Sequence, residues 1–397
     1  MRNRLEDAKS DLLTEAAGVV EHHRGAQPPP GREDAEALLR RYYRHVAPED
    51  LVGRDPVDVY GAAMSQRQLA EQRPQGTANV RAYVPTPDEH GWASGHTVVE
   101  VVTDDMPFLV DSVTMELSRQ DRGIHLVVHP QLVVCRDVSG RLLEVCDLSG
   151  ADLPSADHDD AVVESWMHVE IDRESDPGAL RAIEQDLQRV LRDVRETVED
   201  WDKMRQRALD LADEIAATAF PLPAEEISEA EELLRWLADD HFTFLGYREY
   251  TLESVDGEDA LRAVTGSGLG ILRSDQELSD SFAKLPPAVR SRAREKRLLV
   301  LTKANSRATV HRPTYLDYVG VKAFDQTGEV VGERRFLGLL SSAAYTESVL
   351  RIPVLRRKVV AVLAKAGFTP TSPSGRTCSR SSRRPRATSC SRFPPRT

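Results

Sequence analysis

The sequence lacks a long apolar run, a cysteine framework and an excess of basic residues. No stretch approaches the roughly 18 apolar residues of a membrane-spanning helix, and the acidic amino-terminal stretch lacks the apolar core of a signal peptide. The 4 cysteines have no spacing typical of a zinc site or a disulfide framework. Lys and Arg number 52 against 64 Asp and Glu, and this acidic balance disfavours a nucleic-acid binder. These absences predict a cytoplasmic protein with neither nucleic acid nor membrane as a partner.

Motifs for nucleophilic or metal-dependent catalysis are absent as well. No Gly-x-Ser-x-Gly pattern marks a nucleophile. The histidine pairs His22/His23 and His125/His129 lack a nearby third ligand, so a structural role is favoured over a metal site for both pairs. The sequence therefore predicts no catalytic residue and no metal centre.

One glycine-rich segment, Gly266-Ser-Gly-Leu-Gly270, resembles the start of a dinucleotide-binding fingerprint. In such a fingerprint the glycines let a pyrophosphate approach the N-terminus of a helix. Here no apolar strand leads into the segment, the third glycine comes one residue early, and no crossover helix follows. A structural turn is therefore favoured over a cofactor site, and we expect no cofactor bound by this chain.

The first half of the chain predicts helices followed by a small antiparallel sheet. Residues 1–74 contain helical patterns at 1–24, 35–46 and 57–72. Alternating apolar residues predict strands at 80–84, 98–103, 124–136, 141–148 and 166–172, with a helix at 106–120 between the second and third. Cys135 and Cys146 lie in these strands and suit small core positions. The order of elements predicts an α+β domain at 75–200, with helices on one side of its sheet.

The second half predicts a long helix and a second sheet domain. Residues 177–220 contain no glycine or proline after the first turn until Thr218, which favours one long linking helix that packs partly on another domain or subunit. A mostly antiparallel domain is predicted at 221–352, with strands at 242–251, 298–302, 310–312, 315–324 and 329–340. A basic helix from Pro353 opens a further module, 353–376, and Gly367 stands in a helix-stop position.

The turn from the second strand into the helix at 106–120 is the most informative motif. Its acids stand where a helix N-cap belongs, its proline restricts the turn, and the exposed N–H groups of a helix start suit a small anion such as an amino-acid carboxylate. The candidate effector-binding residues are Asp104, Asp105, Met106, Pro107, Phe108, Leu109 and Asp111. The alternative is an ordinary capped helix start, which the pattern alone favours.

Several long segments resemble the amino-terminal part of the large bacterial NAD-specific glutamate dehydrogenases. These segments are DMPFLVDSV, IHLVVHPQLVVCRD, ADDHFTFLGYREY, SGLGILR and LTKANSRATVHRPTYLDYVGVKAFDQTGEVVGERRFLGLLSSAAYTES, in that order within residues 33–376. The resemblance implies that residues 75–200 form an ACT-type, ferredoxin-like domain and that residues 221–352 form a PAS-like domain. It also places Asp104–Leu109 where ACT domains commonly receive an amino-acid effector. Phe108 replaces the glycine usual after the proline and narrows the space above the helix start.

The resemblance also implies a reaction, the NAD-dependent oxidation of glutamate to 2-oxoglutarate and ammonium. In that family the catalytic and NAD-binding parts lie far downstream of these segments, so no catalytic residue is carried over. We therefore expect a regulatory or assembly fragment that self-associates in a homo-oligomer, responds to an amino-acid effector and is inactive alone. The alternatives are a freestanding ACT-type amino-acid-binding regulatory protein and a complete dehydrogenase.

The tail 377–397 differs in composition from the rest of the chain. It has six arginines, two of the four cysteines and no Asp, Glu or Lys. With permitted codons, a single shift of reading frame turns Thr377–Ser381 into Leu-Leu-Glu-Ile and 386–392 into Arg-Asp-Glu-Leu-Phe-Gln, which matches how family members continue. We expect an out-of-frame, disordered tail instead of a basic RNA-binding segment, and the downstream nucleotide sequence tests this expectation.

Overall fold

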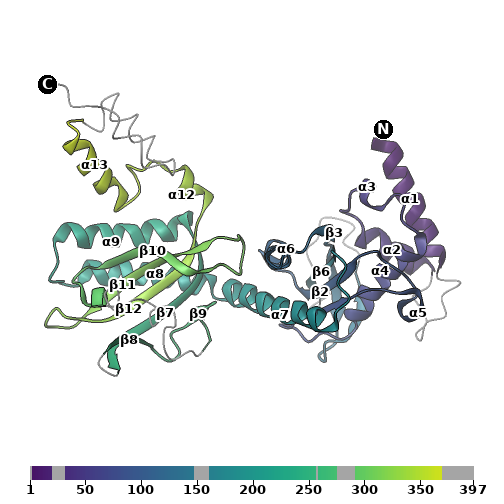
Figure 1. Cartoon of the computed structure of the whole chain (residues 1–397), viewed down its shortest axis with the longest axis horizontal. Helices are drawn as coiled ribbons and strands as arrows, with labels where there is room; N and C mark the ends of the chain where they lie inside the picture. The colour runs from purple at the N-terminus through teal and green to yellow at the C-terminus, as the bar shows by residue number, and fades with distance from the viewer. Residues whose placement is uncertain (1, 20–31, 147–160, 256–257, 275–290, 369–397) are drawn as a thin grey trace. The chain divides into compact units, whose positions relative to one another are not determined.

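The computed structural model describes residues 2–19, 32–146, 161–255, 258–274 and 291–368 (Figure 1). His22, His23 and the tail 377–397 lie outside the described residues, as does most of the proline-rich loop before Arg32. Among the described residues, no helix combines the length and the apolar composition needed to cross a bilayer.

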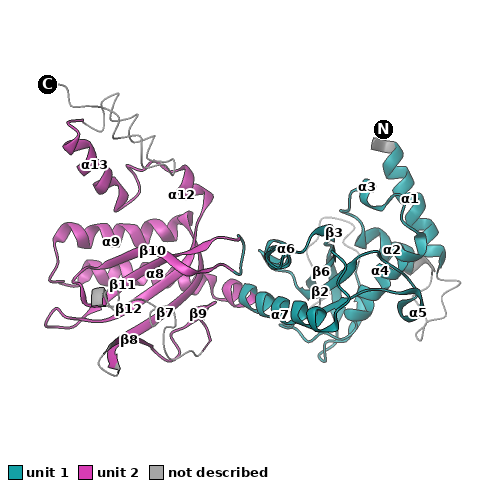
Figure 2. Cartoon of the chain, viewed as in Figure 1, with its two compact units in different colours: residues 1–194, 309–312 teal, residues 195–308, 313–397 magenta. Residues whose placement is uncertain are grey.

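The chain folds into two compact units, drawn in separate colours in Figure 2. Unit 1 comprises Met1–Val194 together with the short segment Thr309–Arg312, and unit 2 comprises Arg195–Ala308 and Pro313–Thr397. Each unit is built on one antiparallel sheet with helices packed against it, so the predicted α+β class is confirmed.

Unit 1 contains a sheet and most of the helices of the first half. Its elements are α1 (Arg2–Gly18), α2 (Arg32–Tyr42), α3 (Pro48–Leu51), α4 (Pro56–Leu69), β1 (Asn79–Tyr83), α5 (Pro87–His90), β2 (Thr97–Asp104), α6 (Leu109–Arg119), β3 (Ile124–Val128), β4 (Gln131–Arg136), β5 (Leu142–Val145), β6 (Ala161–Ile171) and α7 (Pro177–Glu199), the last up to Val194. The strand order is β1-β2-β6-β4-β5, and β3 also pairs with β6. The edge strand beside β2 is β1, which precedes β2 in the chain.

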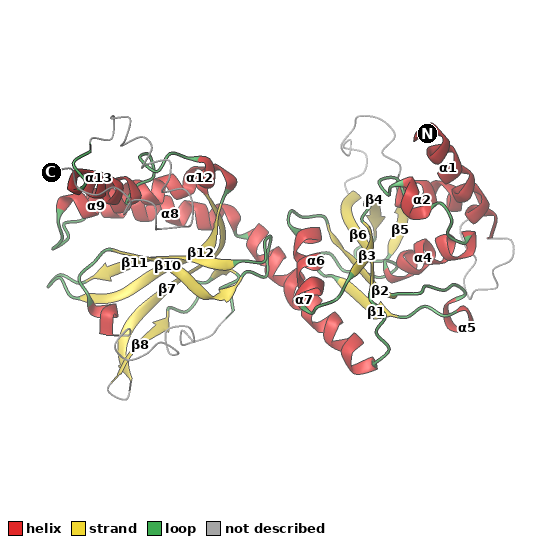
Figure 3. Ribbon diagram, turned by 45° about the horizontal axis from the view of Figure 1, so that its top comes forward, coloured by secondary structure: helices red, strands yellow, loops and turns green. Residues whose placement is uncertain are grey.

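Helices cover both faces of this sheet, so the prediction of helices on one side is wrong. One face packs against α1, α2 and α4 in a single apolar core, and α6 and α7 lie on the other face (Figure 3). The inner strand β2, between β1 and β6, shows the consequence, because Val98, Val99, Val101 and Val102 are all fully buried. The sequence of a strand buried on both faces is a nearly continuous apolar run, and β2 contains two pairs of adjacent valines of this kind.

The predicted long helix is interrupted at Asp200, which separates α7 from α8 (Trp201–Ala217). Asp200 has φ -101° and ψ 3°, and its side chain is almost fully buried. Its carboxylate accepts hydrogen bonds from the backbone N–H of Gly270 at 3.0 Å and from Arg273 Nε at 3.0 Å. These contacts within unit 2 stabilise the interruption between α7 and α8, although residues 195–205 contain no glycine or proline.

Unit 2 has helices on one face of its sheet. Beyond α8, its elements are α9 (Ala224–Trp236), a π-helical turn (Leu237–His241), β7 (Phe242–Val255), β8 (Glu258–Ala263), β9 (Leu269–Gly270), a 3-10 turn (Ser291–Arg294), β10 (Leu299–Arg307), β11 (Tyr315–Phe324), β12 (Val330–Leu340), α12 (Ser342–Thr346) and α13 (Leu355–Lys365). The strand order is β10-β11-β12-β7-β8, with β9 paired to β7. Apolar side chains of α8 and α9 form one core with Phe244 and Phe336 of the sheet.

The predicted strand at 310–312 is wrong. These residues form bends in the segment of unit 1, because His311 has a φ of 74° and the following Arg312 precedes a proline. A positive φ is incompatible with an extended strand. Sequence patterns also missed β8 and β9, two short strands that pair with β7.

Candidate functional site

The predicted effector turn lies between β2 and α6 in unit 1, but its acids do not cap the helix. Asp104 is the last residue of β2, and its carboxylate lies 2.8 Å from Arg73 Nη2 and accepts a hydrogen bond from the backbone N–H of Gly76 at 3.1 Å. Asp105 accepts from Ser165 Oγ at 2.5 Å and from Gln131 Nε2 at 2.8 Å. Both acids therefore bind neighbouring strands and loops instead of the helix N-terminus.

Helix α6 begins at Leu109, later than the predicted start at residue 106, because Phe108 adopts the left-handed conformation. Phe108 occupies the N-cap position with φ 72° and ψ 0°, and no side chain caps the helix. Glycine adopts this conformation at little cost, whereas other residues are strained in it. The backbone geometry thus accounts for a glycine preference at this position. Met106 and Pro107 form the approach to the turn, and Leu109 is buried.

The segment Thr309–Arg312 of unit 1 lies on this turn. The His311 ring faces Phe108 with a centroid separation of 4.9 Å, and the His311 backbone N–H donates to Ser112 Oγ at 3.1 Å. His311 Nδ1 is 3.6 Å from the carboxylate of Asp111. Thr309 Oγ1 donates to Asp193 of α7 at 2.7 Å. The chain itself therefore covers the start of α6, where the sequence predicts an effector.

Arg73, Arg136 and Glu164 form a buried ionic network next to the turn, which the sequence patterns did not predict. Glu164 of β6 has a fully buried side chain and accepts hydrogen bonds from Arg73 at 2.6 Å and from Arg136 at 2.5 Å. Burial acts to raise the pKa of Glu164, but hydrogen bonds from Arg136 and the nearby charge of Arg73 outweigh it, and the pKa is lowered. Because Arg73 also binds Asp104, the network anchors the end of β2.

The second histidine pair and the two cysteines of unit 1 contact neighbouring side chains. His125 contacts Asp172 at 2.8 Å, and His129 contacts Ser165 at 2.9 Å. In the part of the chain that the structure describes, no group of three or more His, Cys, Asp or Glu side chains is placed to hold a metal ion. Cys135 of β4 and Cys146, which directly follows β5, are free thiols with sulfur atoms 3.1 Å apart.

The glycine-rich segment 266–270 does not fit a dinucleotide. A Cβ at Gly268 would lie 2.3 Å from the Leu272 carbonyl oxygen, and one at Gly270 would lie 2.2 Å from the Leu245 carbonyl oxygen. The absence of a side chain at Gly268 and Gly270 therefore leaves room for backbone carbonyl groups of the chain itself. The carboxylate of Asp200 accepts the Gly270 N–H, which places a negative charge where a pyrophosphate would need donors. These contacts support the predicted structural turn.

Comparisons with known proteins agree with the ACT-type reading of unit 1. The sequence profile of the family "Glutamate dehydrogenase, ACT1 domain" matches residues 38–187. The chain is 37% identical over 385 residues to the NAD-specific glutamate dehydrogenase of Halomonas elongata, covering 94% of this chain and 23% of that protein. The enzyme of the same name from Pseudomonas aeruginosa is 36% identical over 365 residues, covering 91% of this chain and 22% of that protein.

The chain belongs to the NAD-specific glutamate dehydrogenase family. A third relative, from Mycobacterium tuberculosis, is 31% identical over 284 residues and covers 69% of this chain. The chain spans less than a quarter of the length of these relatives and corresponds to the amino-terminal region of the family. The matched ACT1 range starts in α2 and therefore includes helices that precede the predicted ACT boundary at residue 75.

Proposed function

We propose that the chain is a regulatory and assembly region of an NAD-specific glutamate dehydrogenase, without catalysis of its own. The observation that carries the proposal is the ACT1 match over residues 38–187, which coincides with the sheet and helices of unit 1. The absence of a fit for NAD at the glycine-rich turn agrees with a role other than catalysis. In the whole enzyme, glutamate, NAD+ and water would yield 2-oxoglutarate, ammonium, NADH and a proton.

The regulatory signal in this proposal is a free amino acid that binds at the turn between β2 and α6. The N-terminal N–H groups of α6 would receive its carboxylate, and residues Asp104–Leu109 with Asp111 would surround it. His311 covers this position, so the effector would compete with the segment Thr309–Arg312. A ligand that displaces a bound segment favours one of two arrangements, which is the requirement for regulation.

The remainder of the chain has proposed roles in connection and assembly. Unit 2, with helices on one face of its antiparallel sheet, would be the PAS-like module, and α7 with α8 would link it to the ACT-type domain. The helix α13 exposes Leu355, Val360 and Val362, apolar side chains suited to packing on a further part of the enzyme or on another subunit. We place the protein in the cytoplasm as part of a homo-oligomer.

Calorimetric titration of the purified chain with each proteinogenic L-amino acid tests the proposed sensing role. We expect saturable binding of at least one amino acid, weakened by Asp105→Ala because this change removes the support that Asp105 gives to the turn. Asp88→Ala, which removes an exposed acid of α5, is the matched control and should bind like the parent chain. If no amino acid binds, the sensing role is contradicted and only an assembly role stands.

A further inference from the structure

Two thiol side chains are in contact at the edge of the sheet of unit 1. Cys135 belongs to β4, and Cys146 directly follows β5, the last strand in the order of this sheet. Their sulfur atoms lie 3.1 Å apart, and both cysteines are free. Because a disulfide needs about 2.05 Å between its sulfur atoms, a movement of about 1 Å would bring the two thiols to bonding distance.

The register of the two strands places both thiols on one face of the sheet. Val134 pairs with Val145, and the Cys146 N–H donates to the Val133 carbonyl oxygen at 2.8 Å. Both members of the valine pair pack in the apolar core formed with α1, α2 and α4. Side chains alternate between the two faces of a strand, so Cys135 and Cys146 are diagonal neighbours on the face away from that core.

Small solutes can reach the two thiols from this face. Both cysteines are partly exposed, although the sequence suggests small core positions for them. Val163 of β6, which pairs with Val133 on the same face, is 40% exposed. Hydrogen peroxide is little larger than water, so partial exposure of a thiol is sufficient for it to react. Exposure and proximity together distinguish this pair from inert cysteines of a closed core.

The protonation of Cys146 favours an order of reaction. Burial raises the pKa of the Cys146 thiol to about 12, and the hydrogen bond with Cys135 adds to this rise. Cys146 therefore keeps its proton at neutral pH and donates it toward the sulfur of Cys135. Since a thiolate is the form that attacks an oxidant, Cys135 is the sulfur expected to react first, with Cys146 as the resolving thiol.

We propose that Cys135 and Cys146 form a redox-sensitive pair, which a peroxide oxidises to a disulfide and a dithiol reduces again. The Cys135 sulfur attacks one oxygen of hydrogen peroxide, the O–O bond breaks, and a sulfenic acid and one water form. The Cys146 sulfur then attacks the Cys135 sulfur, and the thiol proton leaves with the hydroxyl group as a second water. Each sulfur loses one electron, and the peroxide gains two.

The disulfide would close the open end of the β4–β5 hairpin. At its other end the turn is already held, since the Gly140 N–H donates to the Asp137 carbonyl oxygen at 2.9 Å. The ladder between these ends is short and is irregular between Cys135 and Arg136. A covalent link to Cys146 removes open conformations of the hairpin, so oxidation would fix β5 to the sheet. This role is additional to the proposed regulatory function and does not depend on it.

Peptide mapping of the full chain without reductant tests the proposal. Cys378→Ser with Cys390→Ser leaves only the two thiols of unit 1 as the background for the experiment. We expect hydrogen peroxide to consume both thiols and to link the tryptic peptides 123–136 and 142–173, and we expect dithiothreitol to release them. Amide hydrogen exchange in β5 should become at least about fivefold slower in the oxidised protein.

Two single variants in the same background separate the roles of the thiols. Cys146→Ser retains Cys135 and should give a sulfenic acid that dimedone traps. Cys135→Ser should react with peroxide at least about tenfold more slowly, because Cys146 stays protonated. Equal rates for the two variants would overturn the order of reaction.

Two outcomes would overturn the redox pair itself. One is sulfinic or sulfonic acid at either cysteine of the folded background protein without any linked peptides. The other is a disulfide between two chains in place of the link within one chain. Unchanged hydrogen exchange of β5 in protein that carries the internal disulfide would overturn its effect on the hairpin.

Discussion

The ring of His311 lies against the ring of Phe108, with centroids 4.9 Å apart, over the start of α6. Both residues have positive φ angles, 74° for His311 and 72° for Phe108. Two non-glycine residues in the left-handed region are thus held together at the position where an ACT-type domain is expected to receive its effector. The contact joins a strained turn to a segment that covers it.

Phe108→Gly should open the turn without a large loss of stability. Glycine relieves the left-handed backbone, worth about 1–2 kcal/mol, while the lost ring contact with His311 costs about 0.5–1.5 kcal/mol. The two effects nearly cancel. Urea unfolding should therefore give a change below about 1 kcal/mol, and the matched Phe108→Ala variant should be less stable than Phe108→Gly by about 1 kcal/mol. A glycine variant less stable than the alanine variant would contradict the backbone account.

Glu164→Gln should destabilise unit 1 strongly. The substitution leaves Arg73 and Arg136 buried without their shared carboxylate, and breaking a buried ion pair on one side typically costs about 3–5 kcal/mol. Glu144→Gln on the neighbouring strand β5 is the control, because Glu144 is exposed and should cost less than about 0.5 kcal/mol. Chemical unfolding followed by circular dichroism measures both, and equal effects would show that the network contributes little.

The stability of unit 1 should fall in acid partly through Glu170. Burial acts to raise its pKa, but hydrogen bonds from His168 and Arg54 lower it to about 2 from its usual value of 4.5. A folded-state pKa below the unfolded value stabilises the fold above pH 4.5, and this contribution, about 3 kcal/mol, is lost as the pH falls toward 2. The difference in unfolding free energy between the parent chain and Glu170→Gln should shrink over that range. A constant difference would refute the shift.

Asp200→Ala should destabilise unit 2, because the buried carboxylate binds Gly270, Arg273 and Lys203. Hydrogen bonds to a charged group are worth about 1.5–3 kcal/mol each, so a loss of about 2–4 kcal/mol is expected after relaxation. The control Asp202→Ala removes an exposed acid of the first turn of α8 and should cost less than about 1 kcal/mol. Thermal unfolding of both variants checks this, and similar melting temperatures would count against the role of Asp200.

Several elements of the fold followed from local patterns. The strands predicted at 98–103, 315–324 and 329–340 are confirmed as β2, β11 and β12. The start of α6 was misplaced because Pro107 suggested a helix start, whereas the left-handed Phe108 delays the helix to Leu109. The left-handed conformation of a residue other than glycine cannot be recognised from the local sequence.

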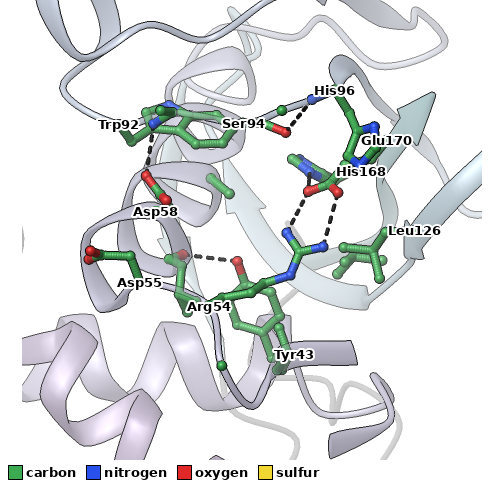
Figure 4. Close-up of a pocket in the computed structure, with 17 residues that line it drawn as sticks. Tyr43, Arg54, Asp55, Asp58, Trp92, Ser94, His96, Leu126, His168 and Glu170 are labelled. Carbon is green, nitrogen blue, oxygen red and sulfur yellow. Dashed lines mark hydrogen bonds and ion pairs between the residues drawn. The ribbon is translucent and has the colours of Figure 1, made fainter. Parts of the chain in front are cut away.

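Neither the break at Asp200 nor the cavity of unit 1 that Tyr43, Asp58 and Glu170 line (Figure 4) could be predicted from the sequence, and the physical reason is the same. Asp200 acts through Gly270, 70 residues later in the chain, so no glycine or proline was needed to end α7. Residues that line this cavity are up to 127 positions apart in the chain, between Tyr43 and Glu170. Such a cavity becomes visible only when the strands and helices that carry these residues are assembled.

A regulatory region without dehydrogenase activity of its own, as we propose for this chain, should not reduce NAD with glutamate. The most direct test incubates the purified chain with glutamate and NAD and follows NADH by absorbance, with a full-length relative from the same family as the positive control. We expect no NADH formation above the buffer control at any chain concentration. Turnover that increases in proportion to the concentration of the chain would contradict the proposed regulatory role.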